Sequence, residues 1–282
     1  MKPLILNAEY MIPENEVPEV NREVELHFTR FGSNKFPGGE SSFQNSNAYK
    51  IFCHVNEPTT CRWTEPVENI IKHHKAYDRI VTSNPEVLRH CVNSTFMAYG
   101  TTWLNKSKHH PDAFGKYQSN LSELEKELSI SMICNSLQGK PGYDLRRTVL
   151  MNQDKINIKK KFYSSTRFPI SGVPFLPGDD KISLFNSMYS VAIESSQEEN
   201  YFTEKLIDCL ITKTIPVYWG CPNIYHYFDT SYWIKMEDVL ENNYTEEHYL
   251  DNMEKINVNC EKAILYTENL FLRIFKLLDV QA

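Results

Sequence analysis

Short apolar runs alternate with amphipathic stretches along much of the chain, and this order predicts strands and helices in turn. Runs rich in β-branched and aromatic residues predict buried strands, whereas apolar residues that recur on one face predict helices. The expected strands are Leu4–Asn7, Tyr49–Val55, Asp78–Thr82, Ile130–Cys134, Met188–Ile193 and Thr214–Trp219. Such alternation is typical of α/β proteins with parallel sheets.

Helices are predicted after three of these strands. Ser83–Glu86 has the form of a capping box, with Ser83 as the N-cap, proline near the first turn and glutamate at the third position, so a helix should run to about His90 or Cys91. Two further helices are expected at Tyr143–Asn152 and Tyr201–Thr212. The stretch Glu246–Leu278 also has helical periodicity, and it is expected to form either a core helix of the second half or a helix that packs back on the first.

The 282 residues are enough for two compact domains. The stretch from Lys106 to Leu121 is polar and broken by a proline and a glycine, so we expect the boundary there. The predicted division is an N-terminal Rossmann-like domain at 1–120, a C-terminal Rossmann-like domain at 121–260 and a terminal helix at 261–282.

Charge and cysteine content exclude several classes of protein. The formal net charge is -6 and the basic residues are scattered, which argues against a nucleic-acid partner. The dense basic run Lys159–Lys161 is expected to be a solvated patch beside a strand. Seven cysteines without close C-x-x-C spacing, a short N-terminal apolar patch and no apolar run of about 18 residues predict a cytoplasmic protein without a signal peptide or transmembrane segment. Its richness in Asn, Lys, Ile and Tyr suits a viral or bacterial source.

Polar side chains with binding chemistry gather after the strand that ends at Ile193. Ligands of open α/β sheets bind where strands end and helices begin, because helix N-termini offer unpaired N–H groups. There, Lys205 could bind phosphate, Glu194 and Glu204 could bind hydroxyl groups, and Tyr201 offers an aromatic face or a hydroxyl. The spacing alone leaves open that these are only exposed helix charges and a strand-end carboxylate.

One long segment carries a family resemblance. The stretch YSVAIESSQEENYFTEKLIDCLITKTIPVYWG, residues 189–220, resembles the donor-binding core of the α1,3/α1,4-fucosyltransferase family. That core has a strand that ends in a FENS-like motif, then a Y-x-T-E-K helix and an IPVYWG-like strand. The chain departs from the pattern at Ile193, where the family usually has Phe, and at Ser195, where it usually has Asn.

The resemblance implies a GT-B-like α/β fold, with two Rossmann-like domains that face a central cleft. It also implies an inverting glycosyltransferase that uses a GDP-fucose-like nucleotide-sugar donor without an essential metal or other cofactor, and an oligosaccharide or glycoconjugate acceptor. By position, Tyr201, Glu204 and Lys205 would contact the donor, with Lys205 near the phosphates. Glu194 would lie beside the nucleotide or the sugar.

Two shorter motifs extend the resemblance. Ser131–Ser136, followed by Arg146 and Arg147, resembles the family's S-N strand and the arginine that pairs with the diphosphate. A guanidinium suits that role because its planar fork donates two parallel hydrogen bonds, but which arginine faces the donor is open. Val55–Pro58 resembles the E-S-P motif, whose glutamate, here Glu57, is the candidate general base. His54 is the alternative base, although a lone histidine is more often structural.

Rival functions differ in donor or in chemistry. A metal-dependent GT-A transferase is disfavoured because the chain has no D-x-D triad to hold a divalent cation on the diphosphate. An exostosin-like GT-B transferase that uses another donor, such as UDP-xylose, is the main alternative. A non-catalytic module that binds a glycan or nucleotide is the second alternative, and it leaves a general base unexplained.

Overall fold

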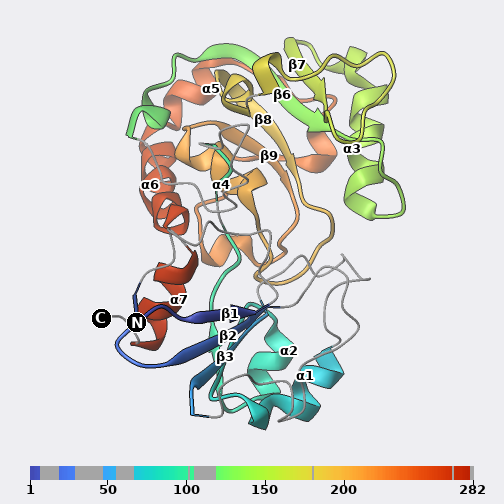
Figure 1. The fold of residues 1–282 in the computed structure, drawn as a ribbon. Coiled ribbons are helices and arrows are strands. Elements are labelled where there is room, and N and C mark those ends of the chain that lie inside the picture. Colours follow the sequence, from blue (N-terminus) through green and yellow to red (C-terminus); the bar gives the residue numbers. More distant parts are fainter. Residues whose placement is uncertain are drawn as a thin grey trace.

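The computed structural model describes residues 1–6, 19–28, 47–54, 67–100, 102–104, 119–179, 181–268 and 270–279. These ranges form two parallel β-sheets with helices packed on their faces, one sheet from each half of the chain (Figure 1). The predicted α/β class is confirmed, with one parallel sheet in each half of the chain. The central cleft and the domain limits at residues 120 and 260 stay predictions.

The first sheet keeps its strands in chain order. They are β1 (Leu4–Leu6), β2 (Val24–Phe28), β3 (Tyr49–His54), β4 (Arg79–Thr82) and β5 (Ser94–Phe96). Successive side chains of a strand point to opposite faces, so each buried strand contributes to two cores. In β3, Phe52 packs in the core with helices α1 (Val67–His73) and α2 (Pro85–His90), while Ile51 and Cys53 pack in the core on the other face.

The other face of this first sheet is covered by the last helix of the chain, α7 (Leu270–Leu278). Its buried residues Phe271, Ile274 and Phe275 share a core with Leu26 of β2 and with β3 and β4 (Figure 1). The end of the chain thus lies on the half where the chain begins. Because burial of apolar side chains is the main favourable term in folding, α7 helps to hold this sheet.

The second sheet reverses its strand order. Its order is β10-β9-β8-β6-β7, with β6 (Glu127–Cys134), β7 (Lys159–Ser164), β8 (Ser187–Ile193), β9 (Ile215–Trp219) and β10 (Ile234–Lys235). The chain passes from β6 outward to β7, then returns to the other side of β6 as β8. In open α/β sheets, ligands bind beyond the carboxyl ends of the strands at such a reversal. The topology therefore marks the ends of β6 and β8.

Helices pack on both faces of the second sheet. They are α3 (Pro141–Met151), α4 (Glu204–Ile211), α5 (Glu246–Asp251) and α6 (Met253–Ile264). One core contains residues of α3 and α5 with Val191 and Ile193 of β8, and the other contains most of α4 with Ala192. All seven residues of β8 are buried, as expected for a central parallel strand.

Three local predictions need correction. The N-cap of α2 is Asn84, not Ser83, because the Asn84 side chain accepts hydrogen bonds from the N–H groups of Glu86 and Val87. The helix predicted at 201–212 begins only at Glu204, since Thr203 is its cap. The basic run Lys159–Lys161 is itself part of a strand, because it forms the first three residues of the edge strand β7.

The C-terminal stretch is divided, with α5, α6 and α7 separated by short breaks instead of one continuous periodic helix.

In the described ranges, no helix combines the length and apolarity needed to cross a bilayer. The six cysteines within them are buried and outside disulfides. Cys61 lies outside the described residues.

Polar contacts join the two halves. The Thr102 hydroxyl donates a hydrogen bond of 2.6 Å to Oδ1 of Asp208 in α4. The Asn200 side-chain amide donates to the carbonyl of Ser83, 3.1 Å away, at the end of β4. Asn200 has a φ of 64°, a left-handed conformation that asparagine tolerates better than most residues.

Candidate functional site

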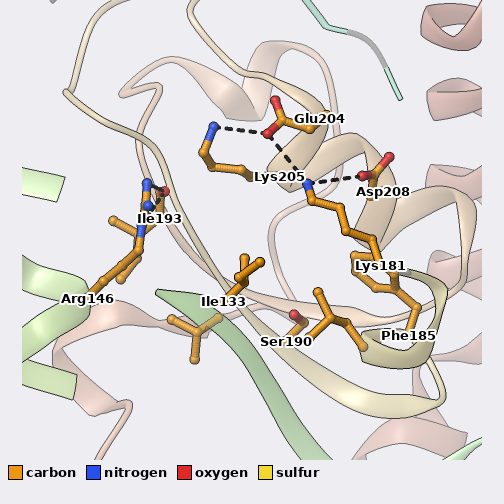
Figure 2. A pocket seen from close by; sticks show the side chains of 11 residues that line it. Ile133, Arg146, Lys181, Phe185, Ser190, Ile193, Glu204, Lys205 and Asp208 are labelled. Atoms are coloured by element: carbon orange, nitrogen blue, oxygen red, sulfur yellow. Dashed lines mark hydrogen bonds and ion pairs between the residues drawn. The ribbon is translucent and has the colours of Figure 1, made fainter. Parts of the chain in front are cut away.

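A pocket lies at the reversal of the second sheet, and residues of β6, β8, α3 and α4 line it (Figure 2). Charged side chains from three segments line it together with apolar ones from the strands. The lining residues are Ile133, Arg146, Lys181, Leu184, Phe185, Ser190, Val191, Ile193, Glu204, Lys205 and Asp208. The topology and the pocket thus indicate the same place.

The start of α4 is built around Glu194. The carboxylate oxygens of Glu194 accept hydrogen bonds from the backbone N–H of Thr203 at 2.7 Å and from its hydroxyl at 2.8 Å. The Thr203 hydroxyl in turn accepts from the backbone N–H of Lys205 at 3.3 Å, which caps the helix. Glu194 therefore fixes the orientation of the helix turn that carries Glu204 and Lys205.

Glu194 is fully buried, and burial raises its pKa, although the Lys205 ammonium at 3.5 Å acts in the opposite direction. Two glycines, Gly142 and Gly220, lie so close to Glu194 that a larger residue at either position would clash with it. A Cβ atom on Gly142, at the start of α3, would stand 1.7 Å from the Glu194 carbonyl oxygen, and one on Gly220 would stand 2.5 Å from its Cγ. Glycine at these positions lets α3 and the end of β9 approach Glu194 closely.

Glu204 lies between two ammonium groups. Its Oε1 is 3.3 Å from Nζ of Lys205 and 3.6 Å from Nζ of Lys181. Figure 2 marks both ion pairs with dashed lines. Burial alone would raise the pKa of Glu204, but the two lysines and the hydrogen bonds outweigh burial and hold the pKa at about 2. The Glu204 carboxylate is therefore charged at neutral pH.

Asp208 follows one turn later in α4 and is fully buried. Its Oδ1 accepts hydrogen bonds from the Thr102 hydroxyl and from the Trp103 backbone N–H, while Oδ2 lies 3.9 Å from Nζ of Lys181. Burial raises the pKa of Asp208 to about 7, with Lys181 acting against it. The folded chain therefore holds the proton of Asp208 more tightly than an exposed carboxyl group would.

The two arginines of α3 have different environments. Arg146 is buried and lines the pocket, where its guanidinium donates two hydrogen bonds to the Ile193 carbonyl, at 3.1 Å and 2.6 Å. Arg147 instead donates to the carbonyls of Ser136 and Leu137 in the loop after β6. Of the two candidates, Arg146 is the one in the pocket lining.

Tyr201 is buried below the start of α4. Its hydroxyl lies 3.2 Å from the Ser195 hydroxyl, and its ring packs near Tyr99, with ring centres 6.1 Å apart. The structure thus brings Tyr201, Glu194, Glu204 and Lys205 into one region, but the side chains of Tyr201 and Glu194 bind protein groups. Contact of these two with a donor stays a prediction.

Glu57, the predicted base, lies outside the described residues. The alternative base, His54, ends β3 and is buried, with Nδ1 3.0 Å from the Thr82 hydroxyl. Burial lowers the pKa of His54 to about 4, so its imidazole is neutral at pH 7 and a weak base. This environment fits the structural role that a lone histidine usually has.

The sequence did not identify Lys181 or Asp208 as candidate site residues. Lys181 opens a 3-10 helix, Lys181–Leu184, in the long connection from β7 to β8, where no strand or helix period marked it. Asp208 is an acidic residue among the apolar residues of α4, and this exception in the pattern could have marked it as a candidate site residue. Its partners, Thr102 and Trp103, come from a segment more than a hundred residues earlier.

The pocket is suited to an anion. Arg146, Lys181 and Lys205 bring three cations to a site where backbone N–H groups of α4 begin, and carboxylates beside them suit hydroxyl groups. Within the described ranges, no group of three or more His, Cys, Asp and Glu side chains could hold a metal ion. Independence from metal stays a prediction.

The comparison with curated proteins supports the family resemblance. Over 50 residues, the chain is 34% identical to the α-(1,3)-fucosyltransferase FucT of Helicobacter pylori. That segment is fucosyltransferase-like. It spans 18% of this chain and a tenth of the length of the curated relative, and no family model matches the chain.

Solved structures that resemble the chain include glycosyltransferases. An α1,3-fucosyltransferase matches with a TM-score of 0.46 and 15% identity, over 90% of this chain and 76% of that chain. An α1,3-fucosyltransferase structure with GDP gives a TM-score of 0.43 and 16% identity, over 90% of this chain and 76% of that chain. Sucrose-phosphate synthase from Thermosynechococcus elongatus gives 0.49 and 10%, over 91% and 73%. The fold assignment rests on the strand order of the chain itself and not on these matches.

Proposed function

We propose that this chain is an inverting glycosyltransferase that moves a sugar from a nucleotide-sugar donor to a glycan hydroxyl, with GDP-fucose as the donor. The observation that carries the proposal is the pocket at the reversal of the second sheet, where Arg146 and Lys205 are both lining residues and Lys205 pairs with the buried carboxylate of Glu204. The 50-residue similarity to a fucosyltransferase supports this choice of donor.

In the proposed reaction, the acceptor hydroxyl oxygen attacks the anomeric carbon as the bond from that carbon to the diphosphate breaks. Attack from the face opposite the leaving GDP inverts the anomeric configuration. Lys205, together with Arg146, stabilises the negative charge that develops on the diphosphate. Glu204, charged at neutral pH, is suited to accept hydrogen bonds from hydroxyl groups of the donor.

Glu57 takes the proton of the acceptor hydroxyl in this proposal. The test is Glu57→Gln, which preserves shape and removes basicity. The variant should bind GDP-fucose as the parent does and lose transfer. Transfer at the parent rate would mean that another group is the base.

The donor is tested by thermal shift with GDP, GDP-fucose, UDP and UDP-xylose, each at about a hundred times its Kd. Binding to the native state alone then adds about 2.7 kcal/mol to the free energy of unfolding. Stabilisation by the guanosine pair is the expected result. Stabilisation by the uridine pair alone would replace GDP-fucose with a donor such as UDP-xylose, and stabilisation by neither pair would overturn the proposal.

A further inference from the structure

Lys181 is a cation of the pocket that no motif pointed to. It reaches the pocket from the connection between β7 and β8 (Figure 2). Its side chain is 19% exposed, close to the 20% of Lys205. Its ammonium is directed at the same carboxylate oxygen of Glu204 that Lys205 contacts. The two ammonium groups therefore lie on either side of one carboxylate oxygen in the pocket.

Within the described part of the chain, the ion pairs of Lys181 are long. Its Nζ lies 3.6 Å from Glu204 Oε1 and 3.9 Å from Asp208 Oδ2, whereas N–H···O hydrogen bonds are about 2.7 to 3.2 Å. Lys205 is bound more tightly, since its Nζ is 3.0 Å from the Thr203 hydroxyl. The ammonium of Lys181 is thus oriented by charge and does not depend on a short bond to either carboxylate.

An aromatic face also holds Lys181 in place. Nζ lies 4.8 Å from the ring centre of Trp103, within the range of a cation–π interaction. The Trp103 backbone N–H donates to Asp208, so the ring and the Asp208 carboxylate form one support for the lysine. A long flexible side chain that is supported on two sides loses less conformational freedom when it binds a ligand.

We propose that Lys181 binds the phosphate groups of the donor and makes the pocket selective for a diphosphate over a monophosphate. This inference rests on the proposed function, because the anion is taken to be the diphosphate of the nucleotide sugar. Two ammonium groups that share one carboxylate repel each other, and a diphosphate offers enough charge and oxygen atoms to bind both. A single phosphate has less charge to satisfy them.

A purely structural role for Lys181 predicts different behaviour. If Lys181 only neutralises Glu204 and Asp208, its removal weakens the fold and changes the affinity for mono- and diphosphates equally. If it binds phosphate, its removal lowers the affinity for the diphosphate much more. The ratio of the dissociation constants for GMP and GDP therefore separates the two roles.

The experiment measures calorimetric binding of inorganic pyrophosphate, GDP and GMP to the parent chain and three variants. Lys181→Met removes the charge and keeps chain length, Lys181→Arg keeps the charge, and Lys155→Met removes an exposed lysine of the same half as a control. Loss of one charge-assisted hydrogen bond should weaken pyrophosphate and GDP binding at least about tenfold in Lys181→Met. GMP binding should change less than threefold or so, and Lys181→Arg and Lys155→Met should bind like the parent.

A second measurement needs no variant. Acylation of lysines in the parent chain, read by mass spectrometry, should show that pyrophosphate protects Lys181 but not Lys155. Equal affinities of Lys181→Met and the parent for pyrophosphate, or no protection of Lys181, would overturn the inference and leave the glycosyltransferase proposal standing. If pyrophosphate binds through Lys181 while no nucleotide binds, Lys181 is a diphosphate ligand but not a donor ligand, and the proposed function fails. No binding of either overturns both.

Discussion

Both carboxylate oxygens of Glu194 are bonded to a single residue, Thr203, one to its backbone N–H at 2.7 Å and the other to its hydroxyl at 2.8 Å. This pair joins the end of β8 to the start of α4. The next two residues of α4 are Glu204 and Lys205, which line the pocket. The positions of Glu204 and Lys205 thus depend on the buried carboxylate of Glu194, which bonds to Thr203 of the protein itself.

We predict that Glu194→Ala destabilises the chain by about 2 to 4 kcal/mol. It leaves the N–H and hydroxyl of Thr203 without their acceptor and removes a charge that pairs with the partly buried Lys205. Urea unfolding followed by circular dichroism measures the change. Glu199→Ala, at an exposed position of the same loop, should lie within about 0.5 kcal/mol of the parent. Equal stabilities of the two variants would contradict this role of Glu194.

Lys205→Ala should lower turnover with GDP-fucose about a hundredfold or more, since preorganised charge at a leaving group is among the larger catalytic contributions. The fold should persist because the bonds between Glu194 and Thr203 remain. Steady-state kinetics gives kcat, and circular dichroism checks the fold, with Lys155→Ala as the matched control. Near-normal turnover of a folded Lys205→Ala chain would remove Lys205 from the phosphate site.

The pH dependence of stability should carry a contribution from Asp208. Burial raises its pKa from the usual value near 4 to about 7, so the folded chain binds its proton more tightly than the unfolded chain does. The stability that this proton provides is complete below pH 4 and is lost as the pH rises through 7. Relative to Asp208→Asn, which has no such proton, the parent should lose a few kcal/mol of unfolding free energy between about pH 4 and 7.

Denaturant unfolding of the parent and Asp208→Asn at several pH values measures this difference. Glu204 contributes with the opposite sign, because its pKa is lowered to about 2 in the folded chain and its stabilisation is lost as the pH falls below the usual pKa of glutamate. Both proteins keep Glu204, so this contribution cancels in the comparison. Parallel stability curves for the two proteins between pH 4 and 7 would show that folding does not raise the pKa of Asp208.

Sequence periodicity predicted the elements whose burial is regular. Strand β8 and the apolar face of α4 were readable because a fully buried strand and a one-sided helix leave strong patterns. Strand β7 was not predicted, since it lies at the sheet edge and opens with three lysines. Lys159 and Lys161 pair there with Glu127 of β6, a contact that only the register of the two strands creates.

The candidate site was predictable where its residues are consecutive. Glu204 and Lys205 could be assigned from a motif, because their positions follow from one helix turn. Lys181 and the support from Trp103 could not, since the contacts between these residues and Asp208 depend on how distant segments pack. Likewise, the sequence could not choose between Arg146 and Arg147, because the choice depends on the rotation of α3 against β8.

The last helix offers a test of how the two ends of the chain stabilise the first sheet. Phe275 is fully buried against β2, β3 and β4, whereas Leu277 in the same helix is 43% exposed. Phe275→Ala should cost about 3 to 5 kcal/mol, because it removes a large buried side chain and leaves a cavity, and Leu277→Ala should cost less than about 1 kcal/mol. Hydrogen exchange should then rise in β3 and β4 of the Phe275 variant while β8 stays protected. Faster exchange in β8 with β3 unchanged would mean that α7 stabilises the second half instead.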